Sequence, residues 1–379
     1  MTPNTFPTPS GALICTAGPS ISEKEISYVT DAITNCWDAR CYEYIQKLEV
    51  KMAEYCKTEF AIATGSCTGG LHLSLWALGI GPGDEVIVPD MTWVASAAPI
   101  TYVGATPVFV DIEKDSWCIA AEAIEKAITP NTKAIIAVHT YGHPADMDAI
   151  NALAKNRGII VIEDAAPSLG STYNGKRTGD LSDVGVFSFH GSKIAVAGEG
   201  GAICTNNKEL HDAIRVIGNH GRDGGRILTA ARWGTKYNMS NLQAAFALAQ
   251  VERMDELLEK KRMNYEWYKC ELEGIEGLQL STERPGVSSN CWQTSFVMEK
   301  DFGISQDDLM VKLKDVGIDS RPFFPPLSRL PMVDQDLHEQ NPVAYFVGDR
   351  GLNLPSRHDL TEEDVQYIGK ELRRILQKA

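Results

Sequence analysis

Short, continuously apolar runs alternate with segments of helical spacing through the first two hundred residues of the chain. The apolar runs predict buried strands, because a strand that is covered on both faces has no polar side to show to water. Seven runs have this character: 60–63, 85–88, 106–110, 134–138, 159–162, 184–189 and 202–205. Helical patterns separate most of them, at 71–78, 94–102, 121–127 and 147–155. We therefore predict an α/β domain built on a seven-stranded, mainly parallel sheet.

Helix signals mark the N-terminal part of the chain. Residues 1–20 are expected to form a loose arm, since they are rich in proline, serine and threonine. Ser22 and Glu25 have the spacing of a capping box, which predicts a helix from there to about residue 35. A second helix is expected at 44–57.

The pattern changes after residue 240. One long helix is expected from there to about residue 271, with Glu256 and Lys260 four positions apart on its exposed face. A strand-like run at 293–298 and helices capped by Ser305 and Thr361 then predict an α+β unit. We expect the arm and the large domain within 1–250, and a linking helix with a smaller C-terminal domain within 251–379.

Composition and charge exclude several classes of protein. The 379 residues carry a net charge of −14 with no basic block, which argues against nucleic acid and against an anionic membrane as partners. No apolar run approaches the roughly 18 residues that span a bilayer, and the N-terminus lacks the pattern of a signal peptide. The nine cysteines form no CxxC pair and no zinc-like cluster with histidine, so we expect reduced thiols, no bound metal and a cytoplasmic protein.

A lysine just past the sixth apolar run is the first candidate for chemistry. Lys193 lies in a glycine-containing loop, and ligands of open α/β sheets bind at the carboxyl ends of strands. An amine among small residues there loses solvent, so that its pKa falls and it can attack a carbonyl carbon as a neutral nucleophile. The alternative is a surface lysine on a glycine-rich loop.

A carboxylate stands at the end of the fifth run. Asp164 follows a continuously apolar segment and precedes two alanines, and a carboxylate in such surroundings needs a cation or good donors. Pyridoxal phosphate (PLP) chemistry uses a lysine and an aspartate together: the lysine holds the aldehyde as a Schiff base, and the aspartate keeps the pyridine nitrogen protonated. The alternative, which fits Asp164 alone equally well, is a cap of the next turn.

A third segment, 61–72, predicts a strand, a turn of small residues and the start of a helix. Such a turn points backbone N–H groups and the positive end of the helix at a phosphate, and the Thr68 hydroxyl adds a donor. The segment is not a P-loop, because no GK[ST] follows. An ordinary helix cap would explain the same residues.

Taken together, these segments resemble the DegT/DnrJ/EryC1/StrS sugar aminotransferases, which are PLP enzymes of fold type I. The resemblance extends from about residue 22 to the C-terminus. It rests on an ordered set of blocks: Gly81-Pro-Gly-Asp-Glu-Val-Ile-Val-Pro89, Thr92-Trp93-Val-Ala, Gly104-Ala-Thr-Pro-Val-Phe, Val138-His-Thr-Tyr-Gly142, Ile162-Glu-Asp-Ala-Ala, Phe187-Ser-Phe-His-Gly-Ser-Lys193, Gly198-Glu-Gly-Gly and Tyr237-Asn-Met-Ser-Asn-Leu-Gln-Ala-Ala245. The Lys193 block and Ser320-Arg-Pro-Phe-Phe324 look most like the perosamine-synthase branch, which aminates C4 of a GDP-linked 4-keto-6-deoxy sugar.

The resemblance implies roles for several residues. Lys193 corresponds to the family's Schiff-base lysine and proton shuttle, and Asp164 to the partner of the pyridinium nitrogen. Trp93 corresponds to the aromatic residue that stacks on the cofactor ring, the alternative being a core tryptophan. Three residues fall where the family places its phosphate contacts: Cys67, Thr68 and Ser188.

Three positions depart from the family pattern. Pro167 stands where the family usually has Gln or Glu, and it has no side-chain donor for the phenolic oxygen of the cofactor. Lys236 stands where the family has an asparagine that reaches the phosphate across the dimer interface, and a lysine serves a phosphate as a point charge. Cys67 replaces a glycine, so that only its backbone N–H could do the same work.

The implied enzyme is a homodimer with its active site at the interface, and it moves an amino group from glutamate to a keto sugar by a ping-pong mechanism. Arg321 is expected to contact the substrate through a diphosphate or a carboxylate, the alternative being a surface arginine. His190 is a second polar candidate there, with a structural role as its alternative. A cyclitol or other non-nucleotide ketone is the second hypothesis for the substrate, and a catalytically silent binding or regulatory protein is a third hypothesis of another class.

Overall fold

The computed structural model describes residues 6–225, 228–333 and 336–378. The helices are α1 (Glu23–Asn35), α2 (Glu43–Cys56), α3 (Cys67–Ala77), α4 (Ala98–Tyr102), α5 (Ala121–Ala127), α6 (Met147–Lys155), α7 (Lys208–Gly218), α8 (Asn241–Glu252), α9 (Met254–Leu272), α10 (Gln306–Asp315), α11 (Pro342–Arg350) and α12 (Glu362–Lys378). The strands are β1 (Phe60–Thr64), β2 (Glu85–Pro89), β3 (Thr106–Val110), β4 (Thr132–Val138), β5 (Ile160–Asp164), β6 (Thr172–Tyr173), β7 (Lys176–Arg177), β8 (Val184–Ser188), β9 (Gly201–Thr205), β10 (Leu278–Leu280), β11 (Val287–Ser288), β12 (Thr294–Met298), β13 (Arg321–Pro322) and β14 (Gly351–Leu354).

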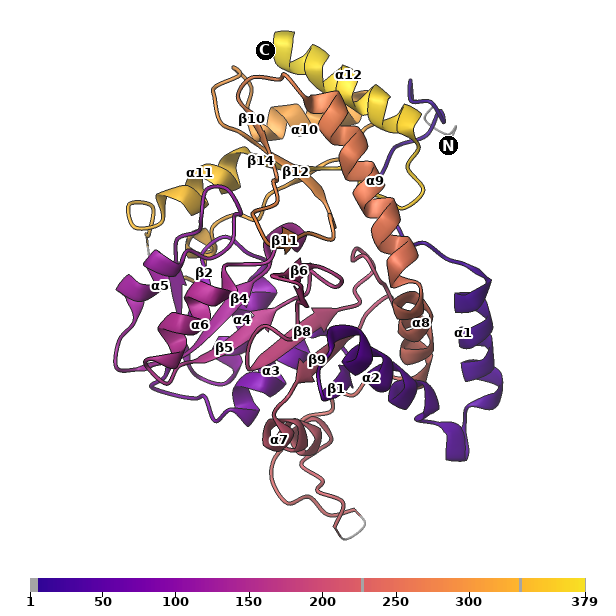
Figure 1. Ribbon diagram of the computed structural model, residues 1–379, viewed down its shortest axis with the longest axis vertical. Coiled ribbons are helices and arrows are strands. Elements are labelled where there is room, and N and C mark those ends of the chain that lie inside the picture. The colour runs from indigo at the N-terminus through magenta and orange to yellow at the C-terminus, as the bar shows by residue number, and fades with distance from the viewer. Residues whose placement is uncertain (1–5, 226–227, 334–335, 379) are drawn as a thin grey trace.

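A seven-stranded sheet forms the larger part of the molecule (Figure 1). Its order is β1-β9-β8-β5-β4-β2-β3, and only β9 runs antiparallel to its neighbours. The seven strands coincide with the seven predicted runs, which confirms the predicted fold class. Because β4, β5 and β8 are parallel neighbours, their carboxyl ends meet at one edge of the sheet.

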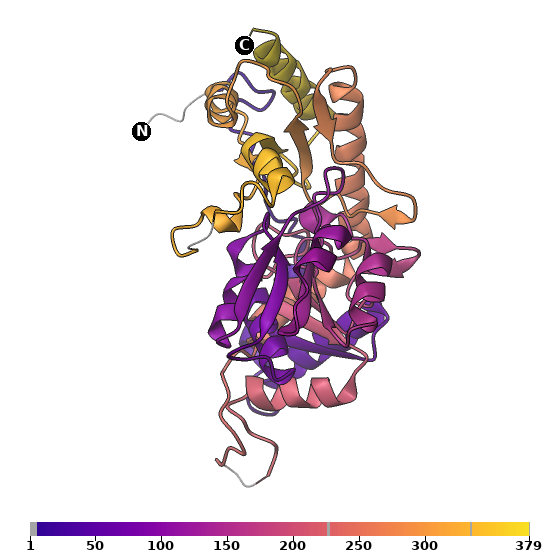
Figure 2. The ribbon, with the colours of Figure 1, turned by 90° about the vertical axis from the view of Figure 1, so that its left-hand side faces the viewer.

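A smaller antiparallel sheet, of order β10-β12-β14-β13, lies toward the end of the molecule that carries the C-terminus (Figure 2). Helices α9, α10 and α12 enclose a separate apolar cluster against it, in which Tyr268, Phe296 and Leu372 are fully buried. A third, three-stranded sheet pairs β11 with β6 and so ties the two parts of the chain together. The division of the chain at residue 250 stays a prediction.

Two predicted helices are divided in the structure. The helix expected from 240 to 271 is two helices, because Arg253 between α8 and α9 has φ −103° and ψ 11°. Its guanidinium pairs with Glu256, so the expected Glu256–Lys260 pair is replaced by an i,i+3 pair. The segment 94–102 likewise splits, into a 3₁₀ turn, Val94–Ser96, followed by α4.

The N-terminal arm is better anchored than expected from its composition. Residues 1–5 lie outside the described residues, but Ile14 forms a parallel β-bridge with Ile318. Beside this bridge, the Thr16 backbone N–H and hydroxyl both donate to the Asp319 carboxylate, at 3.1 and 2.9 Å. The capping box predicted at Ser22 and Glu25 is present at the start of α1.

Three further observations bear on the expected classes of protein. No helix within the described ranges is long and apolar enough to cross a membrane. Three or more His, Cys, Asp or Glu side chains do not gather in a metal-binding arrangement anywhere in the described part of the chain. All nine cysteines are free thiols.

Candidate active site

The sheet brings Asp164 and Lys193 to the same edge. Asp164 is the last residue of β5 and pairs in register with Val186 of the neighbouring strand β8. Lys193 lies five residues beyond the end of β8, in the loop that returns to β9. The two side chains influence each other, because the negative charge of Asp164 acts on the Lys193 amine. The topology therefore places both groups at one edge of the sheet, and their roles toward a cofactor stay a prediction.

The Asp164 carboxylate is buried, with 4% of the residue exposed. Ser96 Oγ donates to its Oδ2 at 2.7 Å, and the backbone N–H of Ala166 donates to Oδ1 at 3.1 Å. Thr92 Oγ1 lies 3.0 Å from Ser96 Oγ and holds that hydroxyl in place. Within the described residues Asp164 forms no ion pair. A buried carboxylate that lacks a cation offers a place for a positively charged group of a ligand.

Lys193 is a partly buried amine with a shifted pKa. Burial lowers the pKa of Lys193 from 10.5 to about 8, while the negative charge of Asp164 acts in the opposite direction. At pH 7 this shift raises the neutral, nucleophilic fraction of the amine roughly 300-fold relative to an ordinary lysine. The amine can therefore form a bond to a carbonyl carbon and also carry a proton.

Side chains of helix α8 form hydrogen bonds with the backbone of the loop that carries Lys193. Gln250 Oε1 accepts from the backbone N–H of Val196 at 3.3 Å, and Gln243 Nε2 donates to the backbone carbonyl of Glu199 at 3.2 Å. The loop is closed on itself by a hydrogen bond from Gly191 N–H to the Gly198 carbonyl at 2.9 Å. Hydrogen bonds to α8 and within the loop thus hold the backbone around Lys193 in place.

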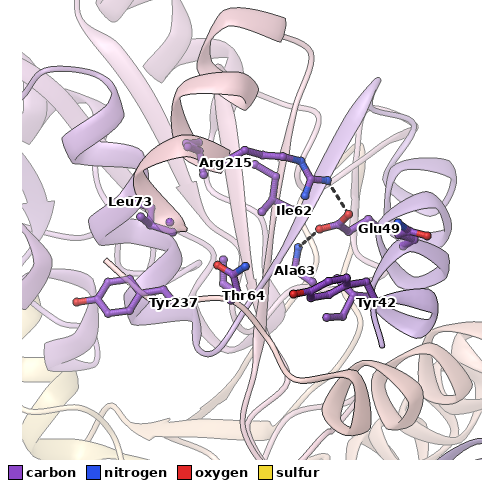
Figure 3. Close-up of a pocket in the computed structure, with 13 residues that line it drawn as sticks. Tyr42, Glu49, Ile62, Ala63, Thr64, Leu73, Arg215 and Tyr237 are labelled. Atoms are coloured by element: carbon purple, nitrogen blue, oxygen red, sulfur yellow. Dashed lines mark hydrogen bonds and ion pairs between the residues drawn. The ribbon is translucent and has the colours of Figure 1, made fainter. Parts of the chain in front are cut away.

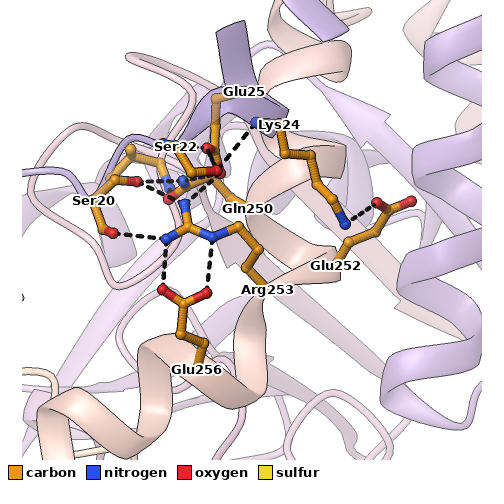
Figure 4. Close-up of polar contacts among 9 residues, drawn as sticks. Ser20, Ser22, Lys24, Glu25, Gln250, Glu252, Arg253 and Glu256 are labelled. Atoms are coloured by element: carbon orange, nitrogen blue, oxygen red, sulfur yellow. Dashed lines mark hydrogen bonds and ion pairs between the residues drawn. The ribbon is translucent and has the colours of Figure 1, made fainter. Parts of the chain in front are cut away.

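Gln250 also reaches a buried ion pair (Figure 4). Its Nε2 donates to Glu25 Oε1 at 2.7 Å, and Arg253 Nη1 donates to the same oxygen at 2.7 Å. The side chains of Glu25 and Arg253 are only 2% and 10% exposed. Burial acts to raise the pKa of Glu25, but hydrogen bonds from Ser22, Arg253 and Gln250 outweigh it, and the pKa lies below its ordinary value.

The start of α3 faces the same edge of the sheet. Ser66 caps the helix by accepting from the Gly69 N–H at 3.0 Å, and Cys67 and Thr68 form its first two residues. Gly201 pairs in register with Ser188 and lies against the start of α3, where an added Cβ would lie 2.7 Å from the Cys67 nitrogen. Ser188 and the first turn of α3 are therefore neighbours, as a shared phosphate site requires. Burial raises the pKa of the Cys67 thiol well above 9.0, so its side chain is neutral.

A pocket beside β1 shows how the turn before α3 is supported (Figure 3). Glu49 Oε1 accepts from the Ala63 N–H at 3.0 Å, and its Oε2 pairs with Arg215 at 2.6 Å, which joins α2, β1 and α7. At the other side, the Gly65 N–H donates to the Tyr237 carbonyl at 2.6 Å. These contacts fix the backbone that leads into Cys67.

An aromatic cluster extends from Trp93 toward Lys193. Trp93 is 60% exposed, which excludes the alternative of a core tryptophan, and its ring lies 6.0 Å from that of Phe324. Phe324 stacks on Tyr141 at 5.3 Å, and Tyr141 faces Trp292 at 6.3 Å. Lys193 Nζ lies 3.9 Å from the centre of the Trp292 ring.

The sequence pointed to neither Ser96 nor Trp292. Ser96 lies only four residues after Thr92, within reach of the Thr92-Trp93 block, so that block could have suggested it. Trp292 carries no local signal.

Four positions that the sequence analysis singled out either lie away from this aromatic cluster or make contacts that support the fold. Lys236 is exposed, and its Nζ donates to Asn219 Oδ1 at 3.3 Å. Arg321 is exposed on β13, and its guanidinium has no hydrogen bond or ion pair to another described residue. The His190 ring contacts Ser192 and Glu199 of its own loop, at 2.9 and 3.8 Å. Pro167 is buried, and its carbonyl accepts from Asn290 Nδ2 at 2.9 Å.

Residues 19–373 match the DegT/DnrJ/EryC1/StrS aminotransferase family. GDP-perosamine synthase of Escherichia coli O157:H7 is 40% identical over 354 residues, which cover 92% of this chain and 95% of that protein. GDP-perosamine synthase of Caulobacter vibrioides is 38% identical, with coverage of 96% and 98%. The PLP-form of a protein described as a sugar aminotransferase, from Streptococcus pneumoniae, superposes with a TM-score of 0.90 at 29% identity, covering 97% of this chain and 99% of that one. The chain therefore belongs to the DegT/DnrJ/EryC1/StrS aminotransferase family and uses PLP as its cofactor.

Proposed function

We propose that the enzyme transfers an amino group from glutamate to a nucleotide-linked 4-keto-6-deoxyhexose, giving a perosamine-type amino sugar. One observation carries this proposal: two GDP-perosamine synthases are 40% and 38% identical to the chain across nearly its whole length. GDP is accordingly the nucleotide expected on the substrate.

The residues at the sheet edge fit PLP. The buried Asp164 carboxylate forms no ion pair within the described residues and suits a protonated ring nitrogen, while Lys193 suits the aldehyde carbon. Ser188 and the first turn of α3, with Thr68, suit the phosphate. When bound, PLP accepts an amino group from a donor and delivers it to a ketone, with its ring as the electron sink.

Each residue then has a defined task. Asp164 holds a proton on the ring nitrogen, which Ser96 supports by fixing the carboxylate. Lys193, with a pKa of about 8, takes a proton from the reacting carbon atom and returns one. Trp93, whose side chain is largely exposed, would stack on the ring of the cofactor.

The proposed assembly is a homodimer in which Lys236 reaches the phosphate held by the partner subunit. The described residues between α7 and α8, 219–225 and 228–240, project from the body of the molecule (Figures 1 and 2). It carries Leu228 and Trp233, which are 88% and 90% exposed and would be covered in a dimer. Arg321, exposed and without a partner among the described residues, is proposed to bind the diphosphate or a carboxylate of a substrate.

The test begins with the visible absorbance of the purified enzyme with PLP. Glutamate should abolish the band, and one keto sugar from a panel of GDP-, UDP- and dTDP-linked sugars should restore it. Lys193→Ala should abolish turnover. Recovery with a nucleotide-free ketone alone would favour the cyclitol-type hypothesis, and a band that no amino donor changes would favour a silent binding protein.

A further inference from the structure

Trp292 makes two contacts with the Lys193 loop. It lies between β11 and β12 and is 5% exposed. The centre of its ring is 3.9 Å from Lys193 Nζ, and its indole N–H donates to the Ser192 carbonyl at 2.7 Å. One side chain therefore contacts both the amine and the backbone next to it.

The backbone of Trp292 is held by the loop that follows Asp164. The Trp292 N–H donates to Asn290 Oδ1 at 2.9 Å. Asn290 Nδ2 donates to the carbonyls of Pro167 and Leu169, each at 2.9 Å. Since Asn290 is fully buried, this connection is shielded from water.

A buried lysine fixes the other end of the Trp292 backbone. Lys261 is 3% exposed, and its Nζ donates to the Trp292 carbonyl at 3.1 Å and to the Ser356 carbonyl. The N–H, the carbonyl and the indole nitrogen of Trp292 are thus all engaged, which leaves its ring little freedom to move.

We propose that Trp292 is a positioning residue that holds the Lys193 amine against its ring and, through Asn290, fixes the Lys193 loop relative to the Asp164 loop. The proposal deepens the proposed function and rests on the role of Lys193 in it. Among the described residues, the titratable groups that act electrostatically on the amine are Asp164 from β5 and Cys67 from α3, and the centre of the Trp292 ring lies 3.9 Å from it. An aromatic face attracts an ammonium ion, so Trp292 favours the protonated form of Lys193 and keeps it in place between proton transfers.

The test compares Trp292→Leu and Trp292→Phe with Trp117→Phe as the matched control. Trp117 is a buried tryptophan of the same aromatic region that packs on Phe323, 4.9 Å between ring centres, and has no contact with Lys193. The full chain, freed of cofactor, is carbamylated with cyanate across a pH series, and the Lys193 peptide is quantified by mass spectrometry. Only the neutral amine reacts, so the pH profile reports the pKa of Lys193.

The Trp292→Leu variant should shift the labelling profile of Lys193 to lower pH by roughly 0.4 to 1.5 units, and Trp292→Phe by less, since phenylalanine keeps an aromatic face. Trp117→Phe should leave the profile in place. In the holoenzyme, Trp292→Leu should lower kcat with little change in KM for glutamate.

Profiles of the two Trp292 variants that coincide with the wild type would overturn the proposal, as would an equal shift in Trp117→Phe. If Trp292→Leu does not fold, the comparison of Trp292→Phe with Trp117→Phe still tests the proposal. Turnover by Lys193→Ala would instead reject the proposed function. The two failures can be told apart, because the labelling experiment does not depend on activity.

Discussion

Replacing Arg253 by methionine should leave the Glu25 carboxylate buried without its cation. The pair is nearly closed to solvent, with side chains 2% and 10% exposed. Removing one partner of a buried ion pair typically costs 3–5 kcal/mol, about as much as the loss of a large core side chain. The methionine side chain is about as long as that of arginine and is apolar, so packing along α8 and α9 should change little.

Protonation of Glu25 sets an upper limit to this cost. From its ordinary pKa of 4.5, a proton at pH 7 costs about 3.4 kcal/mol, which is 2.5 pH units at about 1.36 kcal/mol each. The deficit of the variant should therefore be about 3.4 kcal/mol at pH 7. It should shrink by about 1.4 kcal/mol for each unit that the pH falls, reaching roughly 1.4 kcal/mol at pH 5.5.

The wild type has the opposite dependence on pH. Its Glu25 pKa lies below 4.5 in the folded state, so the stabilisation by this group is complete above 4.5 and is lost as the pH falls through the folded value. Urea unfolding of both proteins at pH 5.5 and 7, at one protein concentration, measures the two deficits. Glu25→Gln/Arg253→Met, which has no charge to bury, is the control and should recover most of the lost stability. Equal deficits of Arg253→Met at the two pH values would refute the reasoning.

Three further outcomes are expected. Asp164→Asn should lower kcat by roughly 10²-fold or more, because a fixed charge at the ring nitrogen is lost, and steady-state kinetics with glutamate measures it. The rate of PLP capture by cofactor-free enzyme should rise with pH and level off above about 8, since only neutral Lys193 attacks, and stopped-flow absorbance would show a flat profile if this is wrong. Gly201→Ala should destabilise the fold by about 1–3 kcal/mol and weaken PLP binding, because the new methyl group would crowd the Cys67 nitrogen, and thermal unfolding with a PLP titration checks both effects.

The sequence allowed us to predict the positions of those candidate site residues that lie at the ends of strands. Asp164 and Lys193 could be placed together because parallel neighbouring strands end at one edge, and the order of apolar runs alone implied such strands. The start of α3 followed from the same rule together with small residues in the turn.

What the sequence missed depends on contacts between distant residues. Ser96 bonds to a carboxylate 68 positions away, and Trp292 bonds to a carbonyl 100 positions away, so no local pattern announces either. The interruption at Arg253 has the same origin. Its neighbours have good helical propensity, but bonds to Ser20 and Glu25 hold its side chain where α8 meets α9.

The bridge between Ile14 and Ile318 has a consequence for how the protein is made. Thr16 and its partner Asp319 are 303 positions apart, so at 5–20 residues per second the ribosome needs roughly 15 to 60 s to deliver the second after the first. During that interval Ile14 and Thr16 lack these two partners. The N-terminal arm can therefore complete its folding only after the segment around residue 318 has been translated. In a nascent chain stalled before residue 317, the arm would stay accessible to proteases and chaperones.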